Sequence, residues 1–150
     1  MSTLSNSMQL ILTLVKSQSQ VLKSLEGALS VHGLSFTEWL VMHRLSQASD
    51  QSIKRASLAS SIGVTASGVT RLLQPMEKVG WVEKTSNARD ARVSLVRLTT
   101  TGARIYAEAT QSIEFAAKKV TNMMNQQQTE QCTGLLSTLH LSALDSSQLS

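Results

Sequence analysis

Hydroxyl, amide and guanidinium side chains gather in one short segment, residues 65–78, and these groups bind phosphates and the edges of bases. A guanidinium such as that of Arg71 can grip guanine O6 and N7 or a phosphate, unless it pairs with Glu77 or Asp90 of its own chain. Each hydroxyl can instead cap a helix or bond its own backbone. The candidate contacts with a nucleic acid are Thr65, Ser67, Gly68, Thr70, Arg71 and Gln74.

A second group of candidates lies in a turn between two strand-like segments, where Arg89 and Arg92 flank Asp90, with Ala88 and Ala91 beside them. Arginines on a projecting turn suit a narrow minor groove, because the negative potential of the groove is strongest where it is narrow. The alternative is a turn that is merely solvated. The segment adds Arg89, Asp90 and Arg92 to the candidate contacts.

A helix-turn-helix spacing positions the first group. Ala59 and Gly63 place small residues one helical turn apart, so two short helices can cross closely, and Gly63 can take the left-handed conformation that ends the first helix. Thr65 then offers an N-cap for the second helix. Residues 81–84 and 93–98, which follow, have strand-like sequences. The order predicts a winged helix-turn-helix, a structure that reads DNA. The buried stripe of the second helix is expected at Val69, Leu72, Leu73 and Met76.

These residues also carry a family resemblance. Asp90-Ala91-Arg92, followed by Leu98-Thr99-Thr100-Thr101-Gly102, resembles the Asp-x-Arg and Leu-Thr-x-x-Gly hallmark of the multiple antibiotic resistance regulator (MarR) family. Residues 69–73 and 77–82 resemble the recognition helix of that family and the exit from it. The resemblance implies a homodimeric transcriptional regulator, usually a repressor and often released by a small molecule. It also implies that Asp90 orients a neighbouring arginine.

Two positions depart from the family pattern. Asn87 stands where the family frequently has a first acid of the wing, and Pro75 interrupts the recognition helix. Because proline lacks an N–H and its ring clashes with the preceding turn, we expect a bend at Pro75.

The chain is expected to form one domain over residues 1–150, mainly α with a small β-hairpin wing (α+β). A winged helix-turn-helix lobe at 35–99 is flanked by dimerisation helices at 1–34 and 100–150. The first helix spans about 5–31 by its apolar period, and Ile53 is expected in a short strand against the wing. The remaining helices are expected to start at Ser35 or Thr37, near residue 55, after Thr65, at Thr99 or Thr100, and after a cap at Thr129.

The first and last two helices carry more apolar surface than 150 residues can cover from within. A second copy of the chain would cover it and place two recognition helices on a pseudo-palindrome in double-stranded DNA, about one helical turn apart. The alternative, a monomeric bundle, offers too few contacts for specific binding. In the last helix we expect Cys132, Leu135, Leu136 and Leu139 to point inward.

Positive charge is concentrated in the same lobe. The net charge is +4, but Lys54–Arg104 hold nine basic and three acidic residues, whereas the rest of the chain holds five basic and seven acidic residues. This segregation is what the neutralisation of phosphates requires. No apolar run approaches the ~20 residues of a membrane span. The first residues lack a secretory layout and one cysteine fits a reducing compartment, so we expect a cytoplasmic protein with no membrane partner.

No residue pattern predicts catalysis, a cofactor or a metal site. His32, His43 and His140 lack cysteine or carboxylate neighbours at the spacing of metal ligands. Cys132 is interpreted as a small buried residue, and the alternative is a peroxide-sensing thiol.

The family resemblance also suggests where an effector would bind. A small aromatic or phenolic molecule is expected in the crevice between the dimer helices and the DNA-reading lobe, near Trp39 and His43, although His43 also suits core packing. The alternative function is a winged-helix protein-interaction module without DNA binding. Such a module would need a neutral or acidic recognition face, and the basic residues argue against it.

Overall fold

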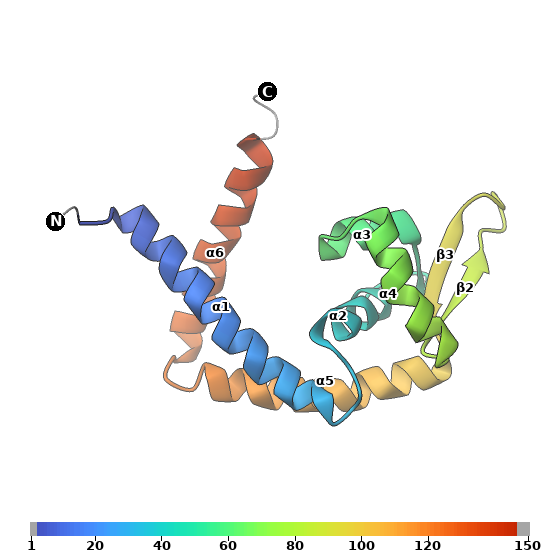
Figure 1. Ribbon diagram of the computed structural model, residues 1–150, viewed down its shortest axis with the longest axis horizontal. Helices are drawn as coiled ribbons and strands as arrows, with labels where there is room; N and C mark the ends of the chain where they lie inside the picture. The colour runs from blue at the N-terminus through green and yellow to red at the C-terminus, as the bar shows by residue number, and fades with distance from the viewer. Residues whose placement is uncertain (1–2, 147–150) are drawn as a thin grey trace. The chain divides into compact units, whose positions relative to one another are not determined.

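The computed structural model describes residues 3–146, with side chains as far as residue 139. Contacts divide the chain into two compact units, residues 1–116 and 117–150. The elements are α1 (Asn6–Ser30), α2 (Phe36–Ser46), β1 (Ser52–Lys54), α3 (Arg55–Ile62), α4 (Ala66–Lys78), β2 (Val82–Ser86), β3 (Ser94–Leu98), α5 (Thr100–Val120) and α6 (Gln126–Ser146) (Figure 1). Helices with one small antiparallel sheet confirm the predicted fold class.

Local capping fixes the first two helices. The hydroxyl of Ser5 accepts a hydrogen bond from the N–H of Met8 at the start of α1, and Gly33 takes a φ of +71° in the turn that follows. Ser35 and Glu38 form a reciprocal capping box at the start of α2, which satisfies two N–H groups that lack partners within the helix. Of the two predicted starts of this helix, the structure uses Ser35.

The α3–α4 pair has the predicted turn. Gly63 ends α3 in the left-handed conformation, with a φ of +74°, and the N–H of Val64 donates to the carbonyl of Ala59 at 3.0 Å. Thr65 caps α4 by accepting from the N–H of Gly68 at 3.0 Å. The two short helices therefore cross where the small residues indicated.

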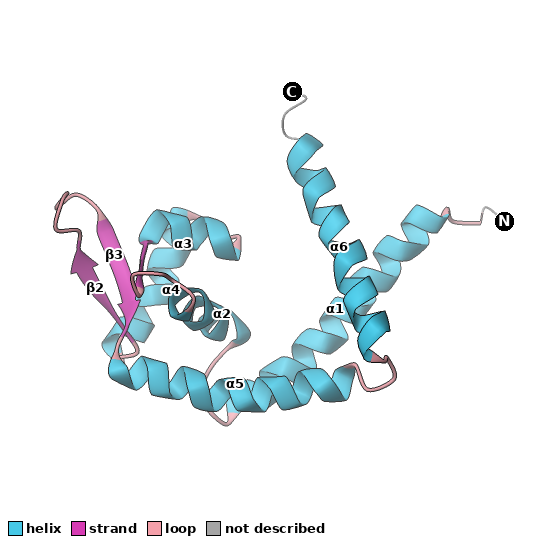
Figure 2. Cartoon of the chain, turned by 180° about the vertical axis from the view of Figure 1, so that it is seen from behind, coloured by secondary structure: helices cyan, strands magenta, loops and turns pink. Residues whose placement is uncertain are grey.

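Three antiparallel strands form the wing, in the order β1-β3-β2. Ile53 of β1 and Lys84 of β2 both lie opposite Val96 of β3, and Val96 is fully buried. The predicted short strand at Ile53 is confirmed. Figure 2 shows the β2–β3 hairpin projecting beyond the helices of the first unit.

The core of the first unit is the place where the apolar faces of its helices and sheet meet. Val69, Leu73 and Met76 of α4 are buried, and Leu72 packs against them while partly exposed, as the predicted stripe requires. Because this stripe is buried in the core, the opposite face of α4 lies toward solvent. The other buried members include Leu29, Val41, Met42, Leu45, Leu58, Val82, Val96, Ala109 and Ile113.

The start of α6 differs from the prediction. Asn125 caps α6. Oδ1 of Asn125 accepts from the N–H of Gln128 at 2.8 Å, and Oε1 of Gln128 accepts from the N–H of Asn125 at 3.0 Å. Thr129 lies inside the helix and its hydroxyl donates to the carbonyl of Asn125, so the predicted cap at Thr129 is wrong. The glutamines extend the helix because glutamine is a good helix former.

The predicted inward face of α6 is also wrong for the single chain. The exposed fraction is 70% for Leu135, 38% for Leu136 and 36% for Leu139, and Cys132 is exposed as well. Helical periodicity indicates that a face is apolar, but it does not indicate which chain covers that face.

Candidate nucleic-acid interface

The solvent face of α4 presents the predicted polar side chains in a row. Ser67, Arg71, Gln74 and Lys78 recur at helical spacing and all are exposed, opposite the buried stripe. An α-helix of this kind fits the major groove of B-DNA. The face is thus held outward by the core and is open to a ligand.

Arg71 has no acidic partner in the structure. Its two candidate partners interact with other groups. Glu77 lies 3.6 Å from the Nζ of Lys84, and Asp90 accepts a hydrogen bond from a backbone amide in the wing. No ion pair among the described residues includes Arg71. Its guanidinium is therefore available for a base edge or a phosphate.

The three hydroxyls of this segment already have partners within the chain. Thr65 caps α4 and also lies 3.2 Å from the hydroxyl of Ser67. The hydroxyl of Thr70 donates to the carbonyl of Ala66 and accepts from Nη1 of Arg55, at 3.1 and 3.0 Å. Thr65 and Thr70 thus cap and support α4, and Ser67 is exposed on its solvent face.

Gly68 leaves room for the cap of α4. A Cβ atom at this position would lie 3.1 Å from the hydroxyl oxygen of Thr65 and 3.5 Å from Cβ of Val64. A side chain would press on the oxygen that caps the helix. Gly68, a predicted contact with the nucleic acid, therefore also has a local structural role.

The wing tip is shaped by two side-chain oxygens. Asn87 Oδ1 accepts from the N–H of Arg89 at 2.9 Å, and Asp90 Oδ1 accepts from the N–H of Arg92 at 3.0 Å. Asn87 therefore makes the same kind of turn bond as an acid would at that position. Asp90 acts on the backbone of Arg92 rather than on its guanidinium. Both arginines are exposed.

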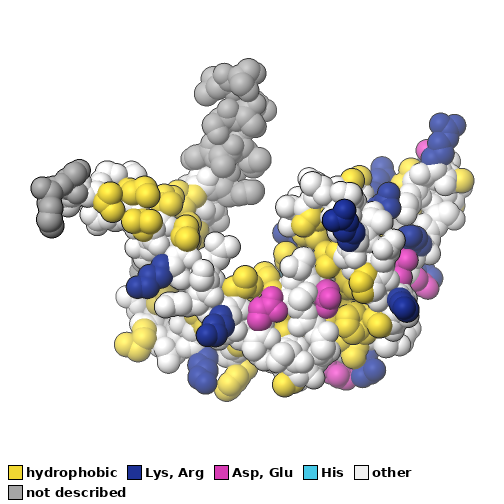
Figure 3. All heavy atoms as spheres, in the orientation of Figure 1, with side chains coloured by type: hydrophobic (Ala, Val, Ile, Leu, Met, Phe, Trp, Pro, Cys, Tyr) yellow, Lys and Arg dark blue, Asp and Glu magenta, His cyan; other side chains and the backbone are white. Residues whose placement is uncertain are grey.

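Positive charge covers this lobe, although not all of it is free. Figure 3 shows Lys and Arg side chains along the wing, including its tip, and over the neighbouring helices. Arg97 is engaged across the hairpin, since its Nε lies 2.6 Å from Oε1 of Glu83, and Lys84 pairs with Glu77. The cations of α4, of the wing tip and of the start of α3 are in none of the ion pairs among the described residues.

Pro75 does not end the helix. α4 runs unbroken from Ala66 to Lys78, and the N–H of Val79 donates to the carbonyl of Pro75 at 3.1 Å. Pro75 and Arg71 are both exposed, and Pro75 has no N–H to donate to the carbonyl of Arg71. The bend expected at Pro75 stays a prediction.

An aromatic stack joins α2 to α5. Trp39 and His43 stack with ring centroids 5.1 Å apart, Nδ1 of His43 lies 2.9 Å from the hydroxyl of Tyr106, and Nε1 of Trp39 donates to Thr110. Nε2 of His32 likewise lies 2.8 Å from the hydroxyl of Ser112. These polar links join α2 and the turn before it to α5.

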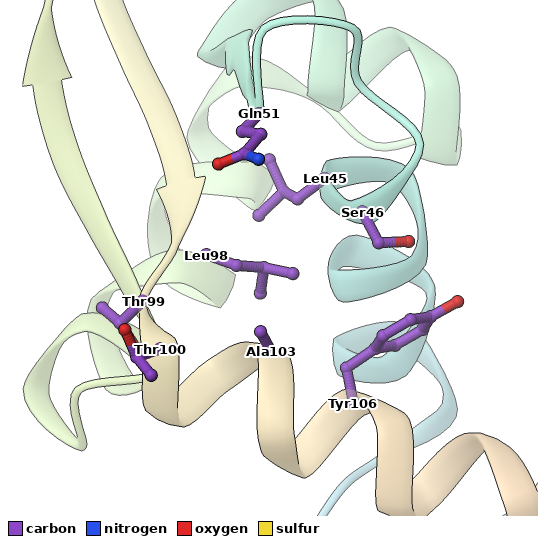
Figure 4. A pocket seen from close by; sticks show the side chains of 8 residues that line it. All are labelled: Leu45, Ser46, Gln51, Leu98, Thr99, Thr100, Ala103 and Tyr106. Atoms are coloured by element: carbon purple, nitrogen blue, oxygen red, sulfur yellow. The ribbon is translucent and has the colours of Figure 1, made fainter.

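A cavity of about 410 Å³ lies beside this stack. In Figure 4, Leu45, Leu98 and Ala103 point toward one space from α2, β3 and α5, with Tyr106 at its side. Gln51, which has a φ of +57°, completes the lining together with Ser46, Thr99 and Thr100. The predicted residues Trp39 and His43 do not line it, but Tyr106 bonds His43.

Within residues 3–146, no helix is long and apolar enough to cross a membrane. The described residues also contain no group of three or more His, Cys, Asp or Glu placed to hold a metal ion. The side chain of His140 lies outside the described part.

Arg55 is the functional candidate that sequence reasoning missed. The sequence marks it only as one of nine basic residues between Lys54 and Arg104, but it begins α3 and its Nη1 donates to the hydroxyl of Thr70 on α4. Its position at the start of a helix was the available signal, whereas its partner lies 15 residues away and depends on the tertiary fold.

Comparison with known proteins supports this description. The MarR family model matches residues 34–94, which run from the turn before α2 to the start of β3. The transcriptional repressor MprA of Escherichia coli K12 is 27% identical over 85 residues, covering 57% of this chain and 48% of MprA. The chain thus spans about half the length of the curated relatives it matches.

Solved structures share the fold. A cysteine-to-serine mutant of MarR from Escherichia coli, complexed with operator DNA, has a TM-score of 0.81 at 24% identity, covering 92% of this chain and 99% of that one. AbsC, a MarR family transcriptional regulator from Streptomyces coelicolor, has a TM-score of 0.84 at 16% identity, covering 95% and 99%. Over residues 34–94 this chain is similar to the MarR family, and it shares the fold of the solved structures.

Proposed function

We propose that the protein is a sequence-specific DNA-binding transcriptional regulator that acts as a repressor. The observation that carries the proposal is the solvent face of α4, where Arg71 is exposed and lacks an acidic partner on a helix held by its buried stripe. Arg71 would read bases in the major groove, and Arg89 and Arg92 would reach the minor groove or the phosphates from the wing. MprA, which is similar over 85 residues, is a transcriptional repressor.

The proposed assembly is a homodimer on a pseudo-palindromic operator. α1 exposes Met8, Ile11, Leu12, Val15 and Leu22, each at least 37% exposed, and these recur at helical spacing. α6 exposes its own leucines. Apolar faces of this extent indicate a partner surface, and a second copy of the chain would cover them while pairing two α4 helices.

A small aromatic or phenolic effector is the proposed regulator of this binding. The cavity lined by Leu45, Leu98 and Tyr106 is bounded by α2, β3 and α5, so a ligand there would bias how the wing and α2 rest on α5. Trp39 and His43 would act through Tyr106 rather than by direct contact. The proposed role is non-catalytic and needs no cofactor. The protein is proposed to act in the cytoplasm.

A winged-helix interaction module without DNA binding is less well supported, because the exposed face of α4 is basic. The experiment is selection of duplexes from a random DNA pool by the purified protein, followed by sequencing. Enrichment of a two-fold sequence with half-sites about one helical turn apart is expected. Arg71→Ala should lose that enrichment, whereas Arg104→Gln on α5 should keep it. A pool that stays random with the wild-type protein would contradict DNA reading and favour the interaction module.

A further inference from the structure

A pocket at the junction of α3, α4 and the wing is lined by cations from two separate segments of the chain. It encloses about 320 Å³. Lys54 and Arg55 come from the start of α3, and Arg92 comes from the base of the wing tip. No acidic residue lines the pocket. The remaining lining residues are Ala56, Ala66, Val69, Val93 and Ser94.

Arg55 is the cation of this pocket that also makes a hydrogen bond to α4. It is partly buried, and Nη1 donates to the hydroxyl of Thr70 at 3.0 Å. No carboxylate within the described part of the chain lies at ion-pair distance from it. A partly buried charge without a counter-charge is unfavourable, and a bound anion would balance it.

Backbone donors lie at the same place. Lys54 occupies the N-cap of α3, and no side chain caps this helix, so the first N–H groups of α3 remain open to an acceptor. They add to the cations of the pocket, which carry the argument. Cationic side chains and amide donors together are the groups that bind phosphate oxygens.

We propose that this pocket seats one phosphate group, supplied by the DNA backbone in each half-site. The inference rests on the proposed function and extends it from base reading to positioning. Because Arg55 also holds Thr70 on α4, the phosphate contact fixes the angle at which α4 enters the groove. A free phosphate ion has the same chemistry, and the experiment separates the two sources.

The first test measures binding to a mixed-sequence duplex over a salt series. Arg55→Gln should weaken binding on the order of tenfold or more per half-site and lower the salt slope by about one per half-site. The matched control is Arg104→Gln, which removes the same charge from an exposed pair on α5 and should leave both values unchanged. Arg55→Lys keeps the charge without the guanidinium fork, so it should retain part of the affinity. Thermal unfolding of each variant checks that it is folded.

The second test replaces single phosphates of a selected duplex with neutral methylphosphonates. At one position per half-site the neutral linkage should weaken wild-type binding by about the same factor as Arg55→Gln, and it should not weaken Arg55→Gln further. Additive losses at every position would overturn the assignment, because they would mean that Arg55 contacts none of the phosphates.

The third arm titrates inorganic phosphate onto the free protein and follows the backbone amides by NMR. Shifts that depend on Arg55, combined with DNA binding that Arg55→Gln leaves intact, would assign the pocket to a free anion and overturn the DNA-phosphate proposal. Wild-type protein that binds no duplex at all would refute the proposed function, and this proposal with it. If Arg55→Gln and Arg104→Gln bind DNA equally strongly, the phosphate site at Arg55 is contradicted, while the proposed function stands.

Discussion

A Cβ atom at Gly102 would overlap the carbonyl oxygen of Trp81, so α5 passes the turn behind α4 at a distance that only glycine permits. The N–H of Thr99 donates to that same carbonyl at 3.1 Å. The hydroxyl of Thr99 donates to the carbonyls of Gly80 and Trp81 and accepts from the N–H of Gly102. The Leu-Thr-x-x-Gly sequence therefore ties the wing and α5 to the exit of α4.

Gly102→Ala should destabilise the protein by about 1–3 kcal/mol or more, because the added methyl group meets backbone that cannot move aside. The measurement is the free energy of unfolding in urea. Gly27→Ala on α1 is the matched control, since a Cβ there meets nothing within 4 Å, and it should stabilise by roughly 0.5–1 kcal/mol through helix propensity. Equal effects of the two changes would contradict the close approach at Gly102.

Thr99→Val should cost about 0.5–2 kcal/mol, the usual value of a lost N-cap, because valine has the same shape but leaves the N–H of Gly102 and two carbonyls without the hydroxyl. Thr99→Ser keeps that oxygen and should lose less. Thermal unfolding of both variants decides. If serine is as damaging as valine, the hydroxyl is not what matters and the methyl packing is.

The helix ends that sequence predicted correctly are local features. Ser35 and Thr65 cap their helices and Gly63 ends α3, because a cap depends on bonds within three residues along the chain. Tertiary partners were not predictable in this way. The bond from Arg55 to Thr70 joins two helices whose orientation no short motif specifies, so the supporting role of Thr70 was not predictable from the sequence.

The apolar faces mark a second limit of prediction from sequence. The periodicity of Leu135 and Leu139 correctly indicated an apolar face on α6, but both leucines are exposed in the single chain. A hydrophobic stripe indicates which face of a helix is buried in the functional assembly. It does not distinguish burial in an internal core from burial in an interface between copies.

Ile11→Glu should shift the protein from dimer to monomer. The side chain is 43% exposed on α1, and each of the two copies would lose the burial of an isoleucine, roughly 1.5–3 kcal/mol, and gain an unpaired charge. Sedimentation velocity over a range of concentrations measures the change, which should exceed tenfold in the dissociation constant. The control is Gln20→Glu, which adds the same charge to the opposite side of α1. A wild-type protein that sediments as a monomer at all concentrations would contradict the proposed homodimer.

Replacement of Arg71 and replacement of the wing arginines should weaken DNA binding in different ways. Arg71→Ala removes a base reader on α4, so it should cost about 1–3 kcal/mol on the selected duplex and relax sequence preference at one position per half-site. Arg92→Ala or Arg89→Ala removes a charge from the tip of the wing, so each should weaken binding to all sequences and reduce the salt slope by about one unit per half-site.

Binding of each variant to the selected duplex and to a scrambled duplex, over a salt series, separates the two roles. Arg71→Ala should narrow the difference in affinity between the duplexes, because base contacts contribute only on the selected sequence. The wing variants should leave that difference unchanged, because a phosphate contact is made on both. If Arg71→Ala weakens both duplexes equally while a wing variant changes the preference, the roles are reversed. If neither changes affinity, this face does not bind DNA, and the exposed arginines serve a protein partner instead.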